Sequence, residues 1–452
     1  MRSNTPDEET IAALATPRGV GAIAIVRLSG PRALEVAAGL VRRPDKLRAC
    51  ATHRLLPVDI VLEDGSTLDQ ALCAVFRRPH GYTGEDAAEI YLHGSPYIVD
   101  RTLERCFALG ARPAQPGEFT LRAYLNGRFD LAQAEAVADL IAAGSETAHR
   151  TAMAQREGAL SRRLGSLRER LTRLCGLLEL EFDFSDQEAP LVEPTTLKEE
   201  LTSVDGELQV LEASFTRGRL AREGAVVALA GAPNVGKSTL FNALLGEDRA
   251  IVDATPGTTR DAVEAVVEWD GLVLRLVDTA GQAGHFQGPD RQASDRARIA
   301  ARAADAVLWV WDLTKGVDQD PPPPELADRT LLVGNKADLA FRPQIAAFPG
   351  LAVSALKGHG VEKVKEAILR LVLPDGGLQT ADGPLTRERH CEAVRRARDD
   401  LSRGLAVIRD DRGQELLAQD LREAATHLGE ILGEITPDDV LNRVFADFCI
   451  GK

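Results

Sequence analysis

Leucine side chains recur along two distant stretches of the chain at the spacing of a buried helix face. The first stretch carries six of them at intervals of four and three: Leu160, Leu164, Leu167, Leu171, Leu174 and Leu178. The second repeats these intervals far downstream: Leu417, Leu421, Ala424, Leu428 and Ile431. Such intervals place the side chains on one stripe of an α-helix, and an apolar stripe needs a cover. We therefore expect the two helices to cover each other in one helical bundle. Two unrelated amphipathic helices in separate domains are the alternative.

Between the two stripes, short apolar runs alternate with helical segments. Each run ends in small or polar residues, and five of them stand out: residues 225–231, 272–281, 306–314, 330–338 and 351–356. This alternation predicts a parallel-sheet nucleotide-binding fold, whose ligands bind at the carboxyl ends of the strands. The pattern thus indicates a nucleotide-binding domain inserted into a helical bundle.

The first part of the chain mixes short strand patterns with Gly and Pro. Residues 21–30, 69–76 and 87–94 are the strand candidates, and they predict a small α/β domain. After residue 120 the character changes. The Ala-rich stretch FDLAQAEAVADLIAAGS, residues 129–145, has strong helix formers and an Asp near its start. A long helix is expected to begin there.

Composition and charge narrow the class of protein. A chain of 452 residues is too long for one core and should divide into about three domains. Its 68 acidic side chains exceed its 54 basic ones. A surface of this sign repels phosphate backbones, so work on nucleic acid needs a local basic patch or a partner that supplies one. The six cysteines form no CxxC pair, which indicates a reducing compartment. The polar N-terminus and the lack of a long apolar run favour a cytoplasmic protein without a membrane segment.

One glycine-rich stretch has the chemistry of a phosphate-binding loop. The sequence GAPNVGKS, residues 231–238, follows an expected strand and precedes the helical TLFNALLG, which is the context that the motif requires. Backbone N–H groups of the turn and of the helix N-terminus would hold phosphate oxygens. Lys237 would contact the β and γ phosphates and act in catalysis, and Ser238 would ligate Mg²⁺. By itself this motif also fits an ATPase.

The sequence NKAD, residues 335–338, identifies the base. An Asp carboxylate at this place accepts both N1–H and N2–H of guanine, and the later SAL would close over the base. In DTAG, Asp278 would hold Mg²⁺ through water, and in GTTRD, Thr259 would ligate it directly. Together these elements resemble the motifs of small GTPases. The expected GTP-binding residues are Asn234, Val235, Gly236, Lys237, Ser238, Thr239, Asp253, Ala254, Thr255, Pro256, Gly257, Thr258, Thr259, Asp278, Thr279, Ala280, Gly281, Asn335, Lys336, Ala337, Asp338, Ser354, Ala355 and Leu356.

Four stretches, in order along nearly the whole chain, resemble the MnmE (TrmE) family of tRNA wobble-uridine modification GTPases. They are ALATPRGVGAIAIVRLSG, PGEFTLRAYLNGRFDLAQAEAVADLI, GAPNVGKST with GTTRD, and the final FCIGK. The resemblance implies an N-terminal α/β folate-binding domain that dimerises, a discontinuous helical bundle and an inserted Ras-like P-loop GTPase domain. The boundaries expected are 1–118 for the N-terminal domain, 119–221 for the first helical part, 222–375 for the G domain and 376–452 for the second helical part.

The resemblance also implies a reaction. Together with an FAD-dependent partner, MnmG (GidA), a GTPase of this family adds a carboxymethylaminomethyl-type group to carbon 5 of wobble uridine in certain tRNAs. The methylene would come from a folate, 5-formyl- or methylene-tetrahydrofolate. The partner would also carry the basic tRNA surface that this acidic chain needs.

The family's folate contacts fall on Arg27, Glu89, Arg128 and Lys452. Arg128 stands where the family often has Lys, which preserves the charge but not the hydrogen-bond geometry. The set makes chemical sense, because basic groups attract the glutamate tail of folate and a carboxylate pairs with the pterin edge. For Arg27 and Glu89, a surface salt bridge is the alternative.

The resemblance gives the end of the chain a role. If the C-terminal helix folds back onto the N-terminal domain, Gly451 would allow a close approach of the backbone, and Lys452 would face the folate. Cys449 would then lie near the chemistry. It is either a catalytic thiolate nucleophile or a buried structural cysteine.

Position in the phosphate loop assigns Asn234 to a potassium site of this family. Its amide oxygen would bind K⁺ together with groups of Asp253, Thr255 and Thr258. The ion would offset charge that develops between the β and γ phosphates, and dimerisation of the G domains would order the loop. The alternative is that Asn234 has no ligand role.

After DTAG the chain departs from the family pattern. Where the family has a Glu that orients the attacking water, this chain has Gly284, which has no side chain for that task. Gln282 stands where Ras-like GTPases keep their water-positioning Gln, and we expect it to be catalytic. Otherwise an acidic residue such as Asp290 reaches in, or hydrolysis is slow.

A GTP-hydrolysing enzyme of tRNA modification is the function expected. An RNA-binding or ribosome-assembly regulatory GTPase without modification chemistry is the alternative, against which the folate residues and the FCIGK end argue. A third possibility is a folate enzyme whose G domain has lost activity, and only Gly284 favours it.

Overall fold

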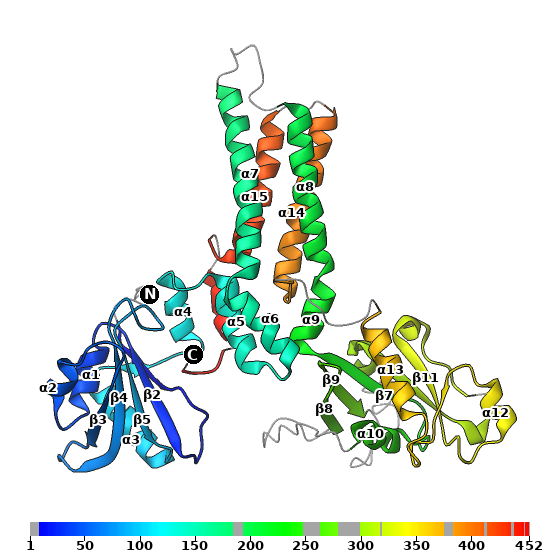
Figure 1. Cartoon of the computed structure of the whole chain (residues 1–452), viewed down its shortest axis with the longest axis horizontal. Coiled ribbons are helices and arrows are strands. Elements are labelled where there is room, and N and C mark those ends of the chain that lie inside the picture. Colours follow the sequence, from blue (N-terminus) through cyan, green and yellow to red (C-terminus); the bar gives the residue numbers. More distant parts are fainter. Residues whose placement is uncertain are drawn as a thin grey trace. The chain divides into compact units, whose positions relative to one another are not determined.

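The computed structural model describes most of the chain in two compact units. The described residues are 9–183, 193–246, 263–278, 299–316, 319–374, 383–410, 414–434, 438–446 and 448–451. One unit combines three segments, 1–138, 155–198 and 399–452, and the other combines 139–154 with 199–398. Figure 1 shows the elements of both. Since this division follows compactness alone, the four domain boundaries expected from the sequence stay predictions.

A six-stranded sheet forms the N-terminal domain. Its strand order is β3-β4-β5-β2-β1-β6, antiparallel except for the parallel pair β1 and β6. The strands are β1 Ile11–Leu14, β2 Ile23–Ser29, β3 Arg54–Val61, β4 Thr67–Phe76, β5 Ala87–His93 and β6 Arg112–Pro113. Helices α1 Ala33–Gly39, α2 Pro44–Arg48 and α3 Pro96–Ala108 contribute apolar side chains to one core with this sheet. The α/β domain and its three expected strands are confirmed, whereas β1, β3 and β6 were not predicted.

A helix begins within residues 129–145 as expected, but the prediction that it is long is wrong. Three helices occupy this region: α5 Leu131–Ala142, α6 Glu146–Arg156 and α7 Ala159–Asp183. Ser145 separates α5 from α6. Its hydroxyl accepts the backbone N–H of Ala148, 3.2 Å away, and so forms the N-cap of α6. Gly158, with φ +80°, separates α6 from α7. The helix formers are strong, but local caps divide them.

The two apolar stripes do cover each other. α7 packs along α15 Gln414–Leu432, and every stripe residue is at most 8% exposed. The second half of α14 Glu388–Asp410 joins them, because Arg403 pairs with Asp420 and Glu423 of α15. A bundle assembled from segments on both sides of a large insertion is confirmed.

Further helices complete both units. α4 Glu118–Leu125 and α16 Asp438–Ala446 lie in the first unit, where Phe445 and Phe448 pack with Leu131 of α5. In the second unit, α8 Pro194–Ala213 pairs with the start of α14 through Arg398, which contacts Asp205 and Glu212, and α9 Phe215–Glu223 precedes the inserted sheet.

The inserted domain is built on a second six-stranded sheet. Its order is β12-β11-β10-β7-β9-β8, parallel except for the antiparallel pair β8 and β9. The strands are β7 Ala225–Ala230, β8 Val263–Trp269, β9 Leu272–Asp278, β10 Ala306–Asp312, β11 Thr330–Asn335 and β12 Leu351–Ala352. Helices α10 Lys237–Leu245 and α12 Arg342–Ala347 and the 3-10 turns Leu313–Lys315 and Pro324–Arg329 lie between strands, and α13 Val361–Val372 follows the last strand. The parallel nucleotide-binding fold is confirmed. The edge strand β8 was not predicted, and β12 is shorter than expected.

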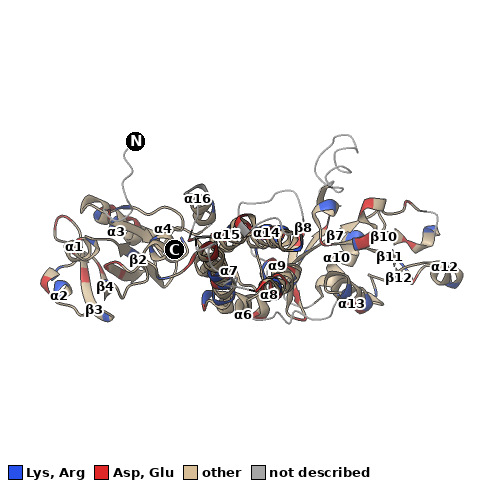
Figure 2. Cartoon of the chain, turned by 90° about the horizontal axis from the view of Figure 1, so that it is seen from above, with Lys and Arg blue, Asp and Glu red and all other residues tan. Residues whose placement is uncertain are grey.

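Charged side chains of both signs are interspersed over the elements (Figure 2). Across the part of the chain that the structure describes, no helix is both long enough and apolar enough to cross a membrane. All six cysteines are free thiols, and five of them are buried while Cys449 is exposed.

Candidate functional site

The phosphate-binding loop lies at the carboxyl end of β7. Its backbone requires glycine twice. A Cβ on Gly231, which has φ +135°, would come within 2.3 Å of the carbonyl oxygen of Val310. A Cβ on Gly236, with φ +95°, would come equally close, 2.3 Å, to Nδ2 of Asn335. Since α10 begins at Lys237, directly after this turn, its first backbone N–H groups can donate to a phosphate at the end of the strand.

Lys237 bridges the loop. Its side chain is almost fully buried, and Nζ donates to the carbonyl oxygens of Gly231 at 2.9 Å and Ala232 at 2.8 Å. Burial lowers the pKa of Lys237, while the nearby charge of Asp278 opposes that shift. The cation is therefore fixed at the place where phosphate charge would enter the loop.

Two of the three residues expected to serve Mg²⁺, Ser238 and Asp278, contact each other. The hydroxyl of Ser238 donates to Oδ2 of Asp278 at 2.6 Å, and the side chain of Asp278, the last residue of β9, is 2% exposed. A hydroxyl and a carboxylate side by side are hard oxygen ligands, which Mg²⁺ prefers. The residues therefore fit the ion that the sequence predicts.

Asn335 ties the base-recognition strand to the phosphate loop. Its Nδ2 donates to the carbonyl oxygen of Val235 at 3.1 Å, and its Oδ1 accepts the backbone N–H of Ala355, also at 3.1 Å. Lys336 strengthens this link, because its Nζ donates to the carbonyl oxygen of Asn234 at 2.9 Å and pairs with Asp312 at 2.7 Å. The first two residues of NKAD thus have structural tasks.

Asp338 is held ready for a base. Its Oδ1 accepts the hydroxyl of Ser354 at 2.7 Å, and Lys357 lies 3.7 Å from its other oxygen. The hydrogen bond from Ser354 is the largest cause that lowers the pKa of Asp338, so the carboxylate stays ionised near neutral pH. Beside it, Ala337 donates its backbone N–H to Val353, and the side chain of Leu356 is 80% exposed. NKAD and SAL therefore converge on one place, as the sequence predicted.

Several expected site residues lie outside the described part of the chain. They are Asp253, Ala254, Thr255, Pro256, Gly257, Thr258, Thr259, Thr279, Ala280, Gly281, Gln282, Gly284, Asp290 and Lys452. One of the two direct Mg²⁺ ligands, Thr259, therefore stays a prediction, as do most of the potassium shell and the water-positioning residue. Of the proposed K⁺ ligands, only Asn234 is described, and its φ of +64° is one that Asn adopts more readily than most residues.

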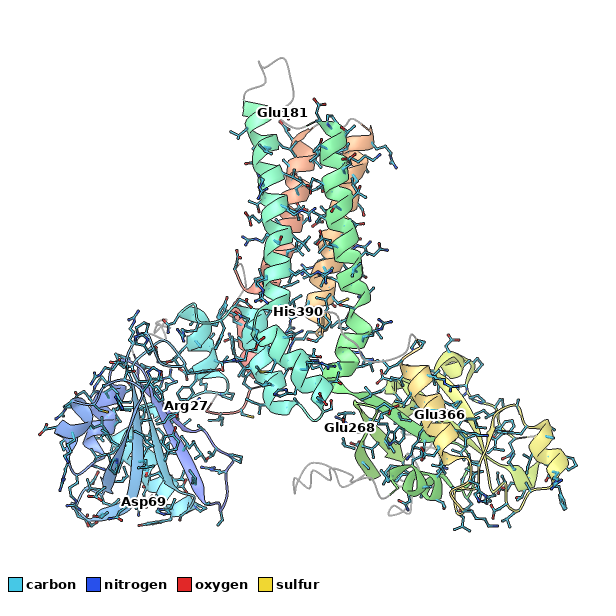
Figure 3. All side chains as sticks on the ribbon, in the orientation of Figure 1. Arg27, Asp69, Glu181, Glu268, Glu366 and His390 are labelled. Carbon is cyan, nitrogen blue, oxygen red and sulfur yellow. The ribbon has the colours of Figure 1, made fainter. Side chains whose placement is uncertain are left out.

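A second site lies on the N-terminal sheet, where Arg27 of β2 faces Glu89 of β5 (Arg27 is labelled in Figure 3). Two guanidinium nitrogens of Arg27 contact Oε1 of Glu89, at 2.9 and 2.8 Å. The side chains are only 15% and 16% exposed. The salt bridge named by the alternative is therefore formed, but it is largely shielded from solvent, and the folate role of both residues stays a prediction.

The end of the chain reaches this pair. Nη1 of Arg27 donates to the carbonyl oxygen of Gly451 at 3.1 Å. Gly451 has φ +97°, and a Cβ there would come within 2.3 Å of the carbonyl oxygen of Leu14. The close approach expected of this glycine is confirmed. Cys449 is exposed in the same segment, so the alternative of a buried structural thiol is wrong, while its catalytic role stays a prediction.

Aromatic side chains frame the pair, and sequence reasoning missed them. The guanidinium carbon of Arg27 lies 5.6 Å from the ring centre of Tyr82 and 5.7 Å from that of Phe119. The hydroxyl of Tyr91 donates to Oε2 of Glu89 at 2.8 Å. Burial and this hydrogen bond raise the pKa of Tyr91 to about 12, so the hydroxyl remains a donor. Strand alternation, which puts residues 89 and 91 on one face, was the available signal.

Arg122 is a second residue that the sequence did not reveal. Its side chain is 1% exposed and pairs with Glu118 at 3.0 Å and Glu85 at 3.2 Å. Glu85 also accepts the hydroxyl of Ser29 on β2. This buried network fixes α4 against the sheet that carries Arg27. By contrast, Arg128 is exposed, its side-chain carbons lie beside Gly84, and no described contact joins it to the Arg27–Glu89 pair.

Gly451→Ala is expected to release the C-terminal segment from the N-terminal domain. Alanine at a φ of +97° costs about 1 to 3 kcal/mol of conformational strain, and the contact of its Cβ with the Leu14 carbonyl oxygen adds to this cost. Amide hydrogen exchange of the last residues should accelerate. Gly65→Ala is the matched control, because Gly65 also has positive φ but open space around it. Unchanged exchange in Gly451→Ala would contradict this account.

The fold and the first site together define a class. A mainly parallel sheet carries a phosphate loop at the end of one strand, a Ser and Asp pair suited to Mg²⁺ beside it, and an ionised Asp after another strand where a guanine edge would lie. The chain is a guanine-nucleotide-binding protein of the P-loop type.

Comparison with known proteins identifies the family. The model of the MnmE helical domain matches residues 131–449, and that of the GTP-binding protein TrmE N-terminus matches residues 10–128. Proteins named tRNA modification GTPase MnmE align over their whole length. That of Moorella thermoacetica is 42% identical, with 98% of this chain and 100% of the relative covered. One from Thermus thermophilus is 43% identical, with 98% of this chain and 99% of the relative covered. The chain therefore belongs to the MnmE family of tRNA modification GTPases.

Proposed function

We propose that this chain hydrolyses GTP to support the addition of a carboxymethylaminomethyl-type group to carbon 5 of wobble uridine in tRNA. A folate, 5-formyl- or methylene-tetrahydrofolate, provides the one-carbon unit, and an FAD-dependent partner of the MnmG (GidA) type shares the chemistry. The observation that carries the proposal is the presence of two sites in one chain: a guanine-specific phosphate site, and the Arg27–Glu89 pair reached by the C-terminal Gly451.

In the G domain, the described residues bind and orient the nucleotide. Asp338 accepts the guanine N–H groups, and the backbone of the phosphate loop surrounds the β phosphate. Lys237 exchanges its two carbonyl contacts for phosphate oxygens. Ser238 and Asp278 would hold Mg²⁺, which neutralises charge on the β and γ phosphates. Gln282 remains the residue proposed to orient the attacking water.

In the N-terminal site, Glu89 is the group suited to a pterin edge. A carboxylate accepts two neighbouring donors, and the hydrogen bonds from Tyr91 and Arg27 fix the orientation of Glu89. Arg128 and Lys452 would add positive charge beside the bound folate, which is an anion. The exposed thiol of Cys449 lies in the segment that reaches this site, where it could act as a nucleophile once deprotonated.

The remaining assignments follow from membership of the family. We propose a cytoplasmic homodimer that dimerises through its N-terminal domain and reaches tRNA through its complex with the FAD-dependent partner. The net charge of −14 supports tRNA binding through the partner, because the partner would supply the basic surface that this chain lacks overall.

Nucleoside analysis of tRNA tests the proposal. A strain without this chain should accumulate wobble uridine that lacks the modification, and the intact gene should restore it. A variant Glu89→Gln should bind GTP normally but fail to restore the modification, since a neutral amide accepts the pterin edge poorly. Normal tRNA together with defective ribosomal subunits would instead indicate a regulatory GTPase.

Potassium should accelerate GTP hydrolysis by on the order of tenfold or more relative to sodium at matched ionic strength, because K⁺ bound at Asn234 would offset charge in the transition state. The difference should grow with protein concentration if paired G domains order the loop. Asn234→Gly tests the site, since it removes the amide oxygen and tolerates the φ of +64°. Equal, slow rates in both salts would instead support a folate enzyme with an inactive G domain.

A further inference from the structure

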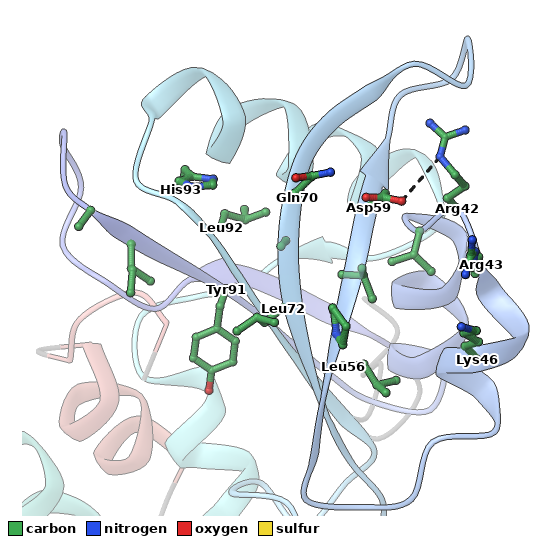
Figure 4. A pocket seen from close by; sticks show the side chains of 16 residues that line it. Arg42, Arg43, Lys46, Leu56, Asp59, Gln70, Leu72, Tyr91, Leu92 and His93 are labelled. Carbon is green, nitrogen blue, oxygen red and sulfur yellow. Dashed lines mark ion pairs between the residues drawn. The ribbon is translucent and has the colours of Figure 1, made fainter.

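A hollow of about 750 Å³ lies on the N-terminal domain (Figure 4). Residues of β2, β3, β4 and β5 line it, together with the segment that connects α1 to α2 and with α2 itself. Its volume is in the range of small-molecule sites. A hollow of this size suits a flexible small molecule better than the wide backbone of a folded RNA.

One end of the hollow adjoins the Arg27–Glu89 pair through Tyr91. Tyr91 lines the hollow, and its hydroxyl donates to Glu89 at 2.8 Å. A molecule that places a ring edge on Glu89 can therefore extend past Tyr91 into the hollow. Between Tyr91 and the other end lie Leu72 of β4, directly opposite Tyr91, and Pro57 of β3, directly opposite Leu72. They offer apolar surface, and Leu72 is 41% exposed.

The other end is cationic. Arg42, Arg43 and Lys46 line it and are all exposed, and Figure 4 shows their charged groups in a row along one side. Arg42 is held by Asp59, whose carboxylate lies 3.9 Å away, and by the hydroxyl of Thr67 at 2.7 Å. Among the described residues, no ion pair engages Arg43 or Lys46. Two cations without partners, in a chain with a net charge of −14, are suited to an anion.

We propose that this hollow binds the oligo-γ-glutamate tail of folate, and that the chain prefers folates with several glutamates over the monoglutamate. The inference rests on the proposed use of folate at the Arg27–Glu89 pair. The order of chemistry along the hollow matches such a ligand: a carboxylate for the pterin, apolar surface for the aromatic middle, and cations for the successive carboxylates of the tail. Arg43 and Lys46 supply the preference, because a monoglutamate ends before it can engage both.

The test compares the binding of 5-formyl-tetrahydrofolate as monoglutamate and as triglutamate to the purified full-length chain at low ionic strength. Triglutamate should bind roughly tenfold more tightly, the gain that two partly exposed charge pairs supply, and the gain should fall at high salt. The double variant Arg43→Ala and Lys46→Ala should lose this gain and keep its affinity for monoglutamate.

Arg48→Ala is the matched control. Arg48 lies on the same helix, but it pairs with Glu35 and Asp45 and does not line the hollow. It should keep the full preference for triglutamate.

Four results would overturn the inference. Equal affinities of the wild type for both folates would overturn the inference and leave the proposed function unchanged. A preference for triglutamate that survives in the double variant would do the same. A double variant whose main change is a weaker association of two copies of the chain would make this surface a subunit contact instead. If neither folate binds the wild type, the proposed use of folate falls as well.

Discussion

Asp338→Asn is expected to change the base that the G domain binds from guanine to xanthine. Guanine presents N1–H and N2–H donors, which the carboxylate accepts, and Asn offers an amide donor in place of one acceptor. Xanthine carries an oxygen where guanine has the amino group. This oxygen accepts the amide N–H of Asn, so the base and residue 338 again form two hydrogen bonds. The affinity for GTP should fall by on the order of 10³-fold, since a buried pairing is lost on both sides.

Titration with fluorescent GTP and XTP analogues measures this change. The hydroxyl of Ser354 can still donate to the Asn oxygen, so the local geometry should persist. Asp328→Asn, an exposed carboxylate of the same domain, should leave both affinities as they were. An Asp338→Asn variant that still prefers GTP would show that another residue recognises the base.

Lys237→Ala is expected to reduce GTP hydrolysis by on the order of 10² to 10³-fold, because Lys237 is the buried cation that lies against the carbonyls of Gly231 and Ala232, where negative charge develops. The loss should appear in single-turnover rates at saturating GTP. The loop also loses the contacts of Nζ with the carbonyls of Gly231 and Ala232, so thermal unfolding of the variant must be measured in parallel. Lys363→Ala, on the exposed face of α13, is the control. A near-normal rate in Lys237→Ala would mean that the phosphate charge is stabilised elsewhere.

Local chemistry made the nucleotide site predictable. A phosphate loop needs glycines at fixed places, and the structure shows why at Gly231 and Gly236, where any side chain would meet a neighbouring strand. The two leucine stripes were predictable for a similar reason, since a helix period of 3.6 residues dictates which side chains are buried. Both features depend on spacing that can be counted along the chain.

Features that depend on contacts between separate segments of the chain were not predicted from the sequence. The strand β8 is an edge strand that contains Glu264 and Glu268, and its pairing with β9 is what makes it a strand. The break between α5 and α6 depends on a single cap at Ser145, against strong helix formers on both sides. The hollow beside Tyr91 needs four strands and a helix to exist, so no single motif records it.

The shared cover of α7 and α15 has a consequence for how the chain is made. The ribosome completes α7 at Asp183 and reaches α15 only at Gln414, with the whole inserted domain between them. At about 5 to 20 residues per second, the leucine stripe of α7 waits for on the order of 10 to 50 s before its cover is synthesised. During this interval an apolar stripe of six leucines faces water or a chaperone. Biosynthesis of this protein should therefore depend on holding factors that bind the nascent chain after α7 emerges, and slow translation of the insertion should lower its yield.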